Sequence, residues 1–216
     1  MLRFAEEIML LLLDDEGGTF VGVPESSLQC ALAGAVLMDL ALENRIDTDP
    51  KQLVLLDSTP VGDNLLDPTL ARIARGSETR DARYWVERIA EDAGYIREAV
   101  LQRLIERGIL QRRDDRFLWV FRSRRYPVVD GKAEREVKLR IMEVLFSDVI
   151  PAPRDIVIIC LADACGLFRE LLSRRERQHA EERIEQVRKL DLIGQAVSQA
   201  VWEIEASIAL AMRPIV

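Results

Sequence analysis

The feature that most constrains the fold of this 216-residue chain is a segment that is apolar almost all round. Over residues 26–44 nearly every helical face is apolar, and Ala31, Ala33, Gly34 and Ala35 give the segment a run of small side chains. A surface helix carries one apolar stripe, whereas a helix that is apolar all round is buried. Small side chains also allow neighbouring helices to pack closely. We therefore expect this segment to be the central helix of a bundle.

Helical periodicity and helix-boundary residues recur along most of the chain. Ser26 or Ser27 is the expected N-cap of the central helix. Helices are expected over residues 2–13, 26–44, 67–74, 81–92, 95–107, 134–146, 154–165, 174–189 and 193–212. β-Hairpins are expected over residues 46–56 and 109–121. No long linker divides the chain, so we predict a mainly α fold, a single-domain helical bundle over residues 1–216 with one or two β-hairpins.

The composition and charge of the chain narrow the function classes. Hydrophobic residues make up 49% of the chain and charged residues 31%, which is typical of a globular protein. The net charge of −7 at pH 7 repels a polyanion, so no nucleic-acid partner is expected. A whole-protein charge does not exclude a local basic patch. Cys30, Cys160 and Cys165 lie in apolar helical segments and are expected to be buried free thiols.

The chain lacks the common catalytic and nucleotide-binding motifs. There is no phosphate-binding loop of the Walker type, no GxGxxG, no GxSxG and no HExxH. The single histidine, His179, lies in a charged helical run. Adjacent acids such as Glu6 and Glu7 point to different sides of a helix. We expect no catalytic residues, no metal site, no cofactor and no enzyme activity.

The most basic stretch of the chain surrounds the second hairpin. It contains six arginines and only two aspartates. The arginines are Arg112, Arg113, Arg116, Arg122, Arg124 and Arg125, and the aspartates are Asp114 and Asp115. We expect the turn at residues 112–115 and the returning strand over residues 117–121. Aromatic rings enter the headgroup region of a membrane, and each cation near an anionic leaflet gains about 1 kcal/mol. The candidate membrane-contact residues are Arg112, Arg113, Arg116, Phe117, Leu118, Trp119 and Phe121, and a further aromatic residue of the stretch is Tyr126.

Other roles for this hairpin remain open at the sequence level. Its apolar face could pack on the core with the arginines in water, or one face could meet another subunit. The helix and hairpin together also match a winged helix, in which the helix from Tyr95 enters a DNA groove and the hairpin turn is the wing. Against this, Glu98, Gln102 and Glu106 would then face the phosphates.

Arg97 is the candidate residue for binding a lipid headgroup. On the helix before the hairpin it shares a row with Leu101, Leu104 and Gly108, at the edge of the apolar stripe. An arginine beside apolar neighbours is partly desolvated, which strengthens its attraction for a phosphate. The alternative is a structural ion pair with a nearby carboxylate.

Several segments resemble the Golgi phosphoprotein 3 family. They are LLLLDDEGGTF near the start, then ALAGAVLMDLALENRI, TPVGDNLLDPTL, RLIERGIL before the hairpin, and AVWEIEASIALAM near the end. The resemblance implies a peripheral adaptor that binds phosphatidylinositol 4-phosphate in a basic pocket, inserts a hairpin into the membrane, self-associates through it and helps to retain glycosyltransferases. Arg97 matches a pocket arginine, and residues 112–121 match the inserting hairpin. Other pocket positions fall near Pro24, Ala33 and Gly94, which lack the matching side chains.

Together these features predict a peripheral membrane adaptor that binds anionic phospholipid headgroups through a basic pocket and a basic-aromatic hairpin. The alternatives are a protein–protein scaffold that oligomerises through the hairpin and a winged-helix DNA-binding protein. The expected partners are an anionic phospholipid membrane surface, a second copy of the chain and a protein cargo. No signal peptide is evident, and the longest apolar run, residues 28–42, is shorter than the roughly 20 residues that span a bilayer. We expect a cytoplasmic protein, peripheral on the cytoplasmic face of a membrane.

Overall fold

The computed structural model describes residues 1–14, 18–48, 52–76, 80–117, 121–190 and 195–211. Its helices and strands in chain order are α1 (Phe4–Leu11), α2 (Glu25–Leu42), β1 (Ile46–Thr48), β2 (Leu53–Leu55), α3 (Asp67–Arg75), α4 (Ala82–Ala90), α5 (Ala93–Glu106), β3 (Arg113–Phe117), β4 (Phe121–Arg125), α6 (Lys132–Phe146), α7 (Pro153–Ala164), α8 (Phe168–Leu171), α9 (Arg174–Arg188) and α10 (Gln195–Ala211). The predicted mainly α fold with β-hairpins is confirmed. The four-residue helix α8 was not expected.

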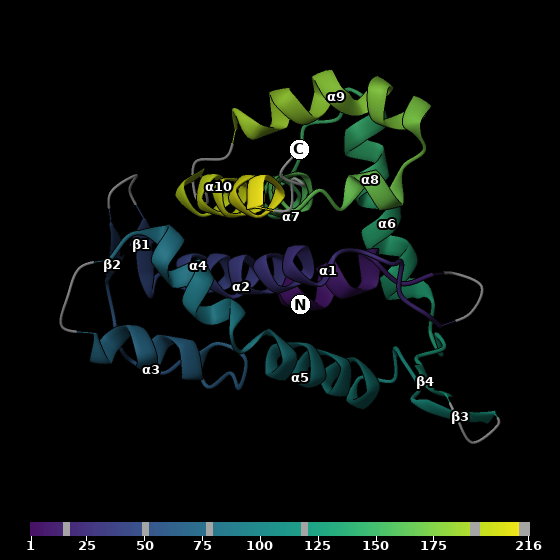
Figure 1. The fold of residues 1–216 in the computed structure, drawn as a ribbon, viewed down its shortest axis with the longest axis horizontal. Coiled ribbons are helices and arrows are strands. Elements are labelled where there is room, and N and C mark those ends of the chain that lie inside the picture. Colours follow the sequence, from purple (N-terminus) through teal and green to yellow (C-terminus); the bar gives the residue numbers. More distant parts are fainter. Residues whose placement is uncertain (15–17, 49–51, 77–79, 118–120, 191–194, 212–216) are drawn as a thin grey trace.

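The helices form layers around α2. Figure 1 shows α1 and α2 along the middle of the molecule, with α5 on one side, α7 and α10 on the other, and α9 beyond them. Helix α6 runs along one end and contacts α1, α7 and α9. Two small antiparallel pairs, β1–β2 and β3–β4, complete the described structure. The long apolar helix therefore occupies the centre, as its sequence predicts.

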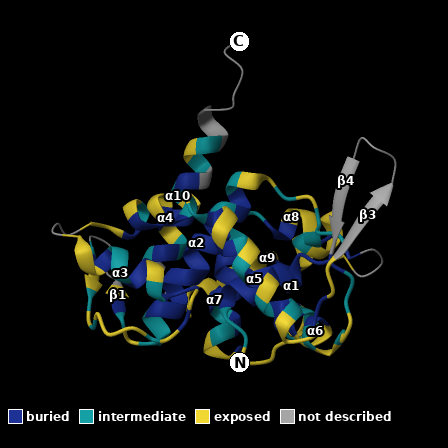
Figure 2. Ribbon diagram, turned by 90° about the horizontal axis from the view of Figure 1, so that it is seen from below, coloured by how far each residue is buried: buried dark blue, intermediate teal, exposed yellow. Residues whose placement is uncertain are grey.

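Helix α2 is buried on every side over most of its length. From Leu28 to Leu40 every residue except Gln29 is buried, and Figure 2 shows the helix inside the protein. With 18 residues and a mean hydropathy of 1.2, α2 is long and apolar enough by composition to cross a membrane, but 72% of this window is buried inside the protein. The neighbouring helices, rather than lipid, therefore cover its apolar surface.

The N-terminus of α2 differs from the expectation. The helix begins at Glu25, its N-cap is Pro24, and no side chain caps it. Ser26 and Ser27 lie within the first turn, so the prediction that one of them is the N-cap was wrong. The extended backbone of Pro24, at φ −53° and ψ 137°, ends the preceding loop two residues before Ser26.

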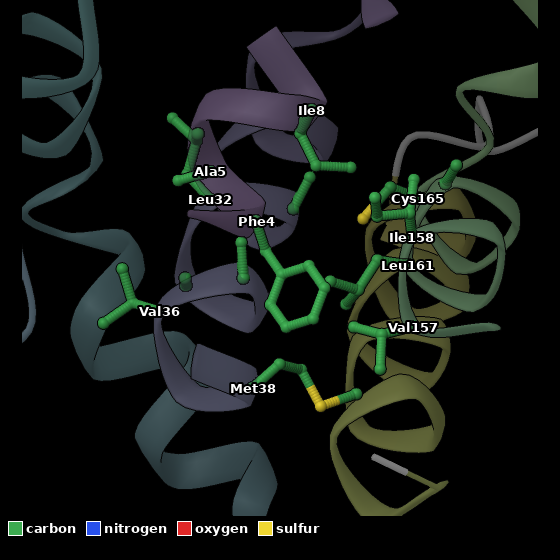
Figure 3. Packing of buried hydrophobic residues seen from close by; sticks show 14 of the residues in the cluster. Phe4, Ala5, Ile8, Leu32, Val36, Met38, Val157, Ile158, Leu161 and Cys165 are labelled. Atoms are coloured by element: carbon green, nitrogen blue, oxygen red, sulfur yellow. The ribbon is translucent and has the colours of Figure 1, made fainter. Parts of the chain in front are cut away.

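Gly34 is where α2 comes closest to the layer of α7 and α10. A methyl group at this position would lie 2.6 Å from Leu161 Cδ2 and 3.6 Å from side-chain carbons of Val197 and Val201. The small residue thus allows a close approach of three helices. Figure 3 shows the same layer near Phe4, whose ring lies between α2 and α7. The cysteines Cys30, Cys160 and Cys165 are buried and free, as expected.

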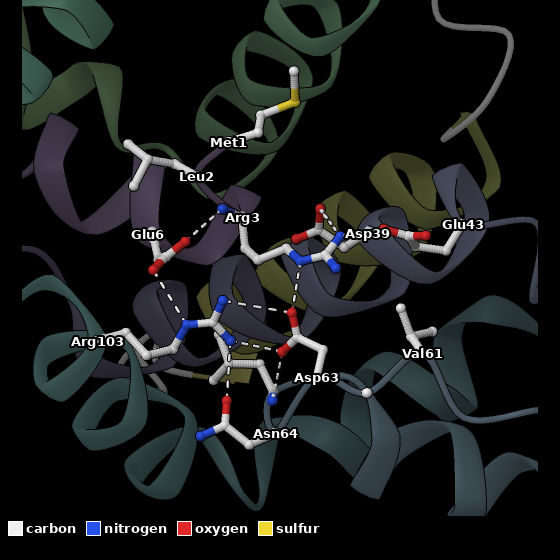
Figure 4. A network of polar contacts seen from close by, with 12 residues as sticks. Met1, Leu2, Arg3, Glu6, Asp39, Glu43, Val61, Asp63, Asn64 and Arg103 are labelled. Atoms are coloured by element: carbon white, nitrogen blue, oxygen red, sulfur yellow. Dashed lines mark hydrogen bonds and ion pairs between the residues drawn. The ribbon is translucent and has the colours of Figure 1, made fainter. Parts of the chain in front are cut away.

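Buried charges link α1 to the surrounding helices and loops (Figure 4). The Nε of Arg3 donates to Asp63 Oδ2 at 2.8 Å, and its Nη1 donates to Glu43 at 2.6 Å. From α5, Arg103 Nη1 donates to Asp63 Oδ1 at 2.6 Å and its Nε donates to Glu6 at 3.3 Å. Burial acts to raise the pKa of Asp63, but hydrogen bonds from Arg103, the Leu65 amide and Arg3 outweigh it and hold that pKa below its ordinary value.

Glu7 points to the opposite side of α1 and meets a second set of arginines. Arg140 Nη2 of α6 donates to Glu7 at 2.8 Å, and Arg154 Nη2 of α7 donates to it at 3.4 Å. The Arg154 guanidinium also lies 4.2 Å from the centre of the Phe4 ring. Burial raises the pKa of Glu7, although both arginines oppose the rise. The two adjacent glutamates therefore serve separate contacts, as expected for neighbours on a helix.

Asp39 is the one buried carboxylate within the apolar body of α2. It is 1% exposed, and its Oδ2 accepts the Phe4 N–H at 2.8 Å, at the N-terminus of α1. Arg3 and Arg154 approach its Oδ1 only to 3.8 and 4.0 Å. Burial, opposed by the Phe4 amide and the two arginines, raises the pKa of Asp39 from 3.8 to about 7. In the folded protein the neutral acid of Asp39 therefore predominates below about pH 7.

The packing at Gly34 predicts that Gly34→Ala changes the free energy of unfolding in opposite directions with and without the Leu161 side chain. In the wild-type background Gly34→Ala should lower the free energy of unfolding by up to about 2 kcal/mol, because overlap with Leu161 costs about 1–3 kcal/mol and the helix preference of alanine offsets about 1 kcal/mol of it. In a Leu161→Ala background the same change should raise it by about 1 kcal/mol, because the space is free and alanine favours the helix. Urea denaturation of the four proteins measures both effects. Equal effects of Gly34→Ala in the two backgrounds would contradict the close approach.

The shifted pKa of Asp39 predicts a pH-dependent effect of Asp39→Asn. The folded state binds more protons than the unfolded state between pH 3.8 and about 7, so this group makes the wild type less stable as the pH rises through that range. The amide mimics the neutral acid and still accepts the Phe4 N–H. The variant should exceed the wild type's free energy of unfolding by about 2 kcal/mol near pH 5 and by up to about 4 kcal/mol near pH 8. Chemical denaturation at both pH values checks this, and a variant that is less stable at pH 8 contradicts it.

Candidate functional site

The second hairpin projects beyond α5 at one end of the molecule (Figure 1). Strands β3 and β4 pair in antiparallel register, with Arg113 opposite Arg125 and Phe117 opposite Phe121. Backbone pairing continues toward the base of the hairpin. There the Gln111 N–H donates to Pro127 O and the Val129 N–H donates to Ile109 O, each at 2.9 Å. The two arms therefore run from residue 109 to residue 117 and from residue 121 to residue 129.

The hairpin is present, but the predicted position of its turn was wrong. Residues 112–115 were expected to form the turn and residues 117–121 the returning strand, whereas residues 113–117 form strand β3. The observed register places Asp114 opposite Arg124, but it also places Arg113 opposite Arg125 and Arg116 opposite Arg122, so cross-strand charge does not account for it. The backbone pairing of β3 with β4 is a long-range feature that the local turn propensity of the polar RRDD segment does not predict. Phe117 and Phe121 form the last described pair of the ladder, so the strands pair up to these two residues.

The candidate membrane-contact residues differ in how far the structure describes them. Leu118 and Trp119 lie outside the described residues. For Arg113, Arg116, Phe117 and Phe121 the backbone is described, in β3 and β4. Arg112 is exposed at the start of β3. Tyr126, which the sequence groups with these aromatic residues, is only 5% exposed and belongs to the protein interior instead.

The base of the hairpin is tied to the loop after α1. The Tyr126 N–H donates to Gly18 O at 2.6 Å, and the Phe20 ring lies 5.8 Å from the Tyr126 ring, centroid to centroid. Gly18 has φ +63°, and a methyl group there would lie 2.4 Å from Pro127 N. Both the positive φ and the close backbone contact require glycine. Sequence reasoning missed this support, although the Gly-Gly-Thr-Phe loop that provides it is a recognisable turn signal.

Arg97 lies beside this support. Its guanidinium carbon is 5.6 Å from the centre of the Phe20 ring, which is the range of a cation–π contact. The side chain is half-buried. No carboxylate of the described residues forms an ion pair with Arg97, so the structural ion pair considered above is not formed there. The result is a fixed, partly desolvated guanidinium next to the hairpin base. We call Arg97, Phe20, Gly18 and Tyr126 the hairpin-base site.

The other positions that correspond to pocket residues of the family do not add charge to this site. Ala33 is fully buried, Gly94 is exposed without a side chain, and Pro24 is the N-cap of α2. Arg97 is therefore the member of that set with a group that can bind an anion. Among the described residues, no three histidine, cysteine or carboxylate side chains gather to hold a metal ion.

Helix α5 presents its polar row to solvent. Its apolar residues are buried: Ile96, Val100, Leu101 and Leu104. The exposed row is Glu98, Gln102 and Glu106. Two carboxylates on the face that would approach DNA repel phosphates, which argues against the winged-helix alternative. The geometry thus favours a small or surface-bound anion at the end of α5 rather than a groove-binding helix.

The chain was compared with known proteins. It is similar to vacuolar protein sorting-associated protein 74 of Eremothecium gossypii, with 25% identity over 207 aligned residues that cover 80% of this chain and 62% of that relative. The chain thus spans about three fifths of the length of the relative. The family model for Golgi phosphoprotein 3 (GPP34) matches residues 4–204, which include the hairpin-base site and nearly every helix. On this match the chain belongs to the Golgi phosphoprotein 3 (GPP34) family.

Proposed function

We propose that this protein is a peripheral membrane adaptor that binds an anionic phospholipid headgroup at Arg97 and inserts the end of the β3–β4 hairpin into the membrane surface. The observation that carries the proposal is the Arg97 guanidinium, which stacks on Phe20 without a carboxylate partner among the described residues. A guanidinium held in this way keeps its donors available for phosphate oxygens and loses little side-chain freedom on binding.

The hairpin supplies the second contact of the proposal. Phe117 and Phe121 form the last pair of the ladder, and the sequence between them is Leu-Trp-Val. Arginines follow on both arms, at Arg116 and Arg122. Apolar residues at the far end with cations behind them suit the boundary between acyl chains and anionic headgroups. The rigid attachment of the base through Gly18 and Tyr126 supports this role, since it sets the direction of insertion.

The adaptor role rests on the family and on the name of the relative. That name associates the relative with vacuolar protein sorting, and we extend such a role to this chain as a proposal: the second partner is a protein cargo. The expected place of action is the cytoplasmic face of a membrane, and no enzyme activity is expected. Phosphatidylinositol 4-phosphate is the first headgroup to test, because the family resemblance implies it. Phosphatidylinositol and phosphatidylglycerol are the comparison lipids, because Arg97 alone represents the family pocket.

The first test measures binding to vesicles. The wild type should co-sediment with phosphatidylcholine vesicles that contain an anionic lipid and not with phosphatidylcholine alone. Arg97→Ala should weaken binding about fivefold, since one cation near an anionic leaflet contributes about 1 kcal/mol. Arg88→Ala is the matched control, because Arg88 is an exposed helical arginine that pairs with Glu91 on α4. An equal loss in both variants would mean that Arg97 contributes only general charge and would contradict the headgroup site.

A second candidate function, a scaffold that oligomerises through the hairpin, has one observation in its favour. Each of β3 and β4 pairs with the other alone, so each strand has an outer edge without a strand partner among the described residues. Such edges can pair with a second copy. Replacing Trp119 and Phe121 by serine separates the two functions, since it removes apolar insertion and leaves the backbone edges intact. The adaptor proposal expects severalfold weaker vesicle binding and, by analytical ultracentrifugation, the mass of a single chain before and after the substitution. Undiminished vesicle binding by a protein that has the mass of two or more chains would favour the scaffold.

A further inference from the structure

A cleft on the far side of the molecule from α5 lies between α8 and α9. It has a volume of about 860 Å³, and two smaller cavities of about 390 and 380 Å³ adjoin it. Asp163 of α7 and Trp202 of α10 line all three. Figure 1 shows α8 beneath one end of α9. The hairpin-base site contributes none of its residues to this cleft, so the cleft is a separate feature of the protein.

Three arginines from two helices line the end of this cleft nearest α8. They are Arg169 of α8 and Arg174 and Arg177 of α9. None of the three forms an ion pair or hydrogen bond through its side chain with the described residues. This distinguishes them from Arg188 at the other end, which lies 3.7 Å from Asp163 and 3.8 Å from Glu185. Carboxylates do line the same cleft, and the charge of Arg169 acts on Asp163, but none of the described carboxylates lies within ion-pair distance of the three arginines.

Arg169 and Arg174 are exposed and Arg177 is partly buried, and two of the three lie where a helix dipole is unfavourable to a cation. Arg174 and Arg177 lie in the first turn of the 15-residue helix α9, where the helix dipole is positive and favours anions. A capping box of Ser173 and Glu176 starts this helix, so the arginines are not needed for that purpose. Arg177 also has its Nε buried without an acceptor. Like charges collected at the positive end of a dipole become favourable once an anion binds between them.

The rest of the cleft supplies an apolar surface. Phe168 and Ile184 are buried behind it, and the Trp202 indole is 55% exposed along its side. Beyond the arginines, α9 continues with Glu181, Glu182 and Glu185, which make the other end acidic. A bare anion would use only the basic end. A ligand with one phosphate and a less polar remainder fits the whole cleft, since the phosphate meets the arginines and the remainder meets the indole.

We propose that the cleft between α8 and α9 binds a phosphate ester, whose phosphate contacts Arg169, Arg174 and Arg177 and whose organic part lies against Trp202. Two sources carry this chemistry: a soluble phosphomonoester and the headgroup of phosphatidic acid in a membrane. The site differs from Arg97 in its helices, and its existence does not depend on the hairpin.

The test compares single substitutions in the full-length protein. Calorimetric titration with glycerol 3-phosphate forms one arm, and co-sedimentation with phosphatidylcholine vesicles containing phosphatidic acid forms the other. Arg174→Ala and Arg177→Ala should each weaken binding about tenfold, the effect expected for a lost hydrogen bond between charged groups. Arg175→Ala is the matched control, because Arg175 shares the same turn of α9 and the same charge but does not line the cleft. Arg175→Ala should bind as the wild type does.

The two measurements distinguish a soluble phosphate ester, a lipid headgroup and the absence of a phosphate site. Binding of glycerol 3-phosphate with the predicted order of variants identifies a soluble ester as a ligand. Vesicle binding with that order, but no calorimetric signal, identifies the lipid headgroup. Equal behaviour of Arg174→Ala, Arg177→Ala and Arg175→Ala in both arms overturns the proposal, as does the absence of binding in both. The unliganded thermal midpoints of all variants should be no lower than that of the wild type, which excludes loss of folding as the cause. Arg97→Ala, measured in parallel, reports on the hairpin-base site independently.

Discussion

Burial of α2 on all sides is the constraint on which the rest of the structure depends. An 18-residue helix with apolar residues on every face must be covered by neighbours, and α1, α4, α5, α7 and α10 do so. Small residues let these neighbours approach, most closely at Gly34, where α2 meets Leu161. The outer helices need only one apolar face each. Helix α9, for example, buries Ala180, Ile184 and Val187 and leaves most of its charged residues in solvent.

Such packing does not by itself select one arrangement of the covering helices, because the hydrophobic interaction between aliphatic side chains is non-directional. The buried charges of α1 add direction. Glu6 faces Arg103 of α5 and Glu7 faces Arg140 and Arg154 of α6 and α7, so each neighbour of α1 has a defined partner. Buried ion pairs contribute little net stability, but a misplaced helix would leave a buried carboxylate unpaired at a cost of several kcal/mol. The network therefore acts mainly on specificity of packing.

Sequence patterns predicted the elements of this fold better than their long-range contacts. The apolar residues that identify α2 and α10 are local features of the sequence, and both helices lie close to their expected bounds. The turn of the second hairpin was misplaced because RRDD has local turn propensity, whereas the pairing of Asp114 with Arg124 depends on a register that local rules do not contain. The partners Arg3, Asp63 and Arg103 are likewise far apart in the chain. At the candidate site, Arg97 was found from its place on the helix, and its support by Phe20 was not.

The difference between local position and long-range partner also separates the proposed anion-binding arginine from a structural one. Arg97 and Arg103 lie on one helix, six residues apart, and have the same side chain. Burial lowers the pKa of Arg103, but hydrogen bonds and charge from Asp63 and Glu6 outweigh it and hold that pKa above its ordinary value, so this guanidinium is occupied inside the protein. Arg97 rests on Phe20, an aromatic ring that holds the guanidinium in place without satisfying its hydrogen-bond donors. Whether an arginine serves the fold or a ligand is thus decided by the residue that faces it, and the net charge of −7 carries no information on that choice.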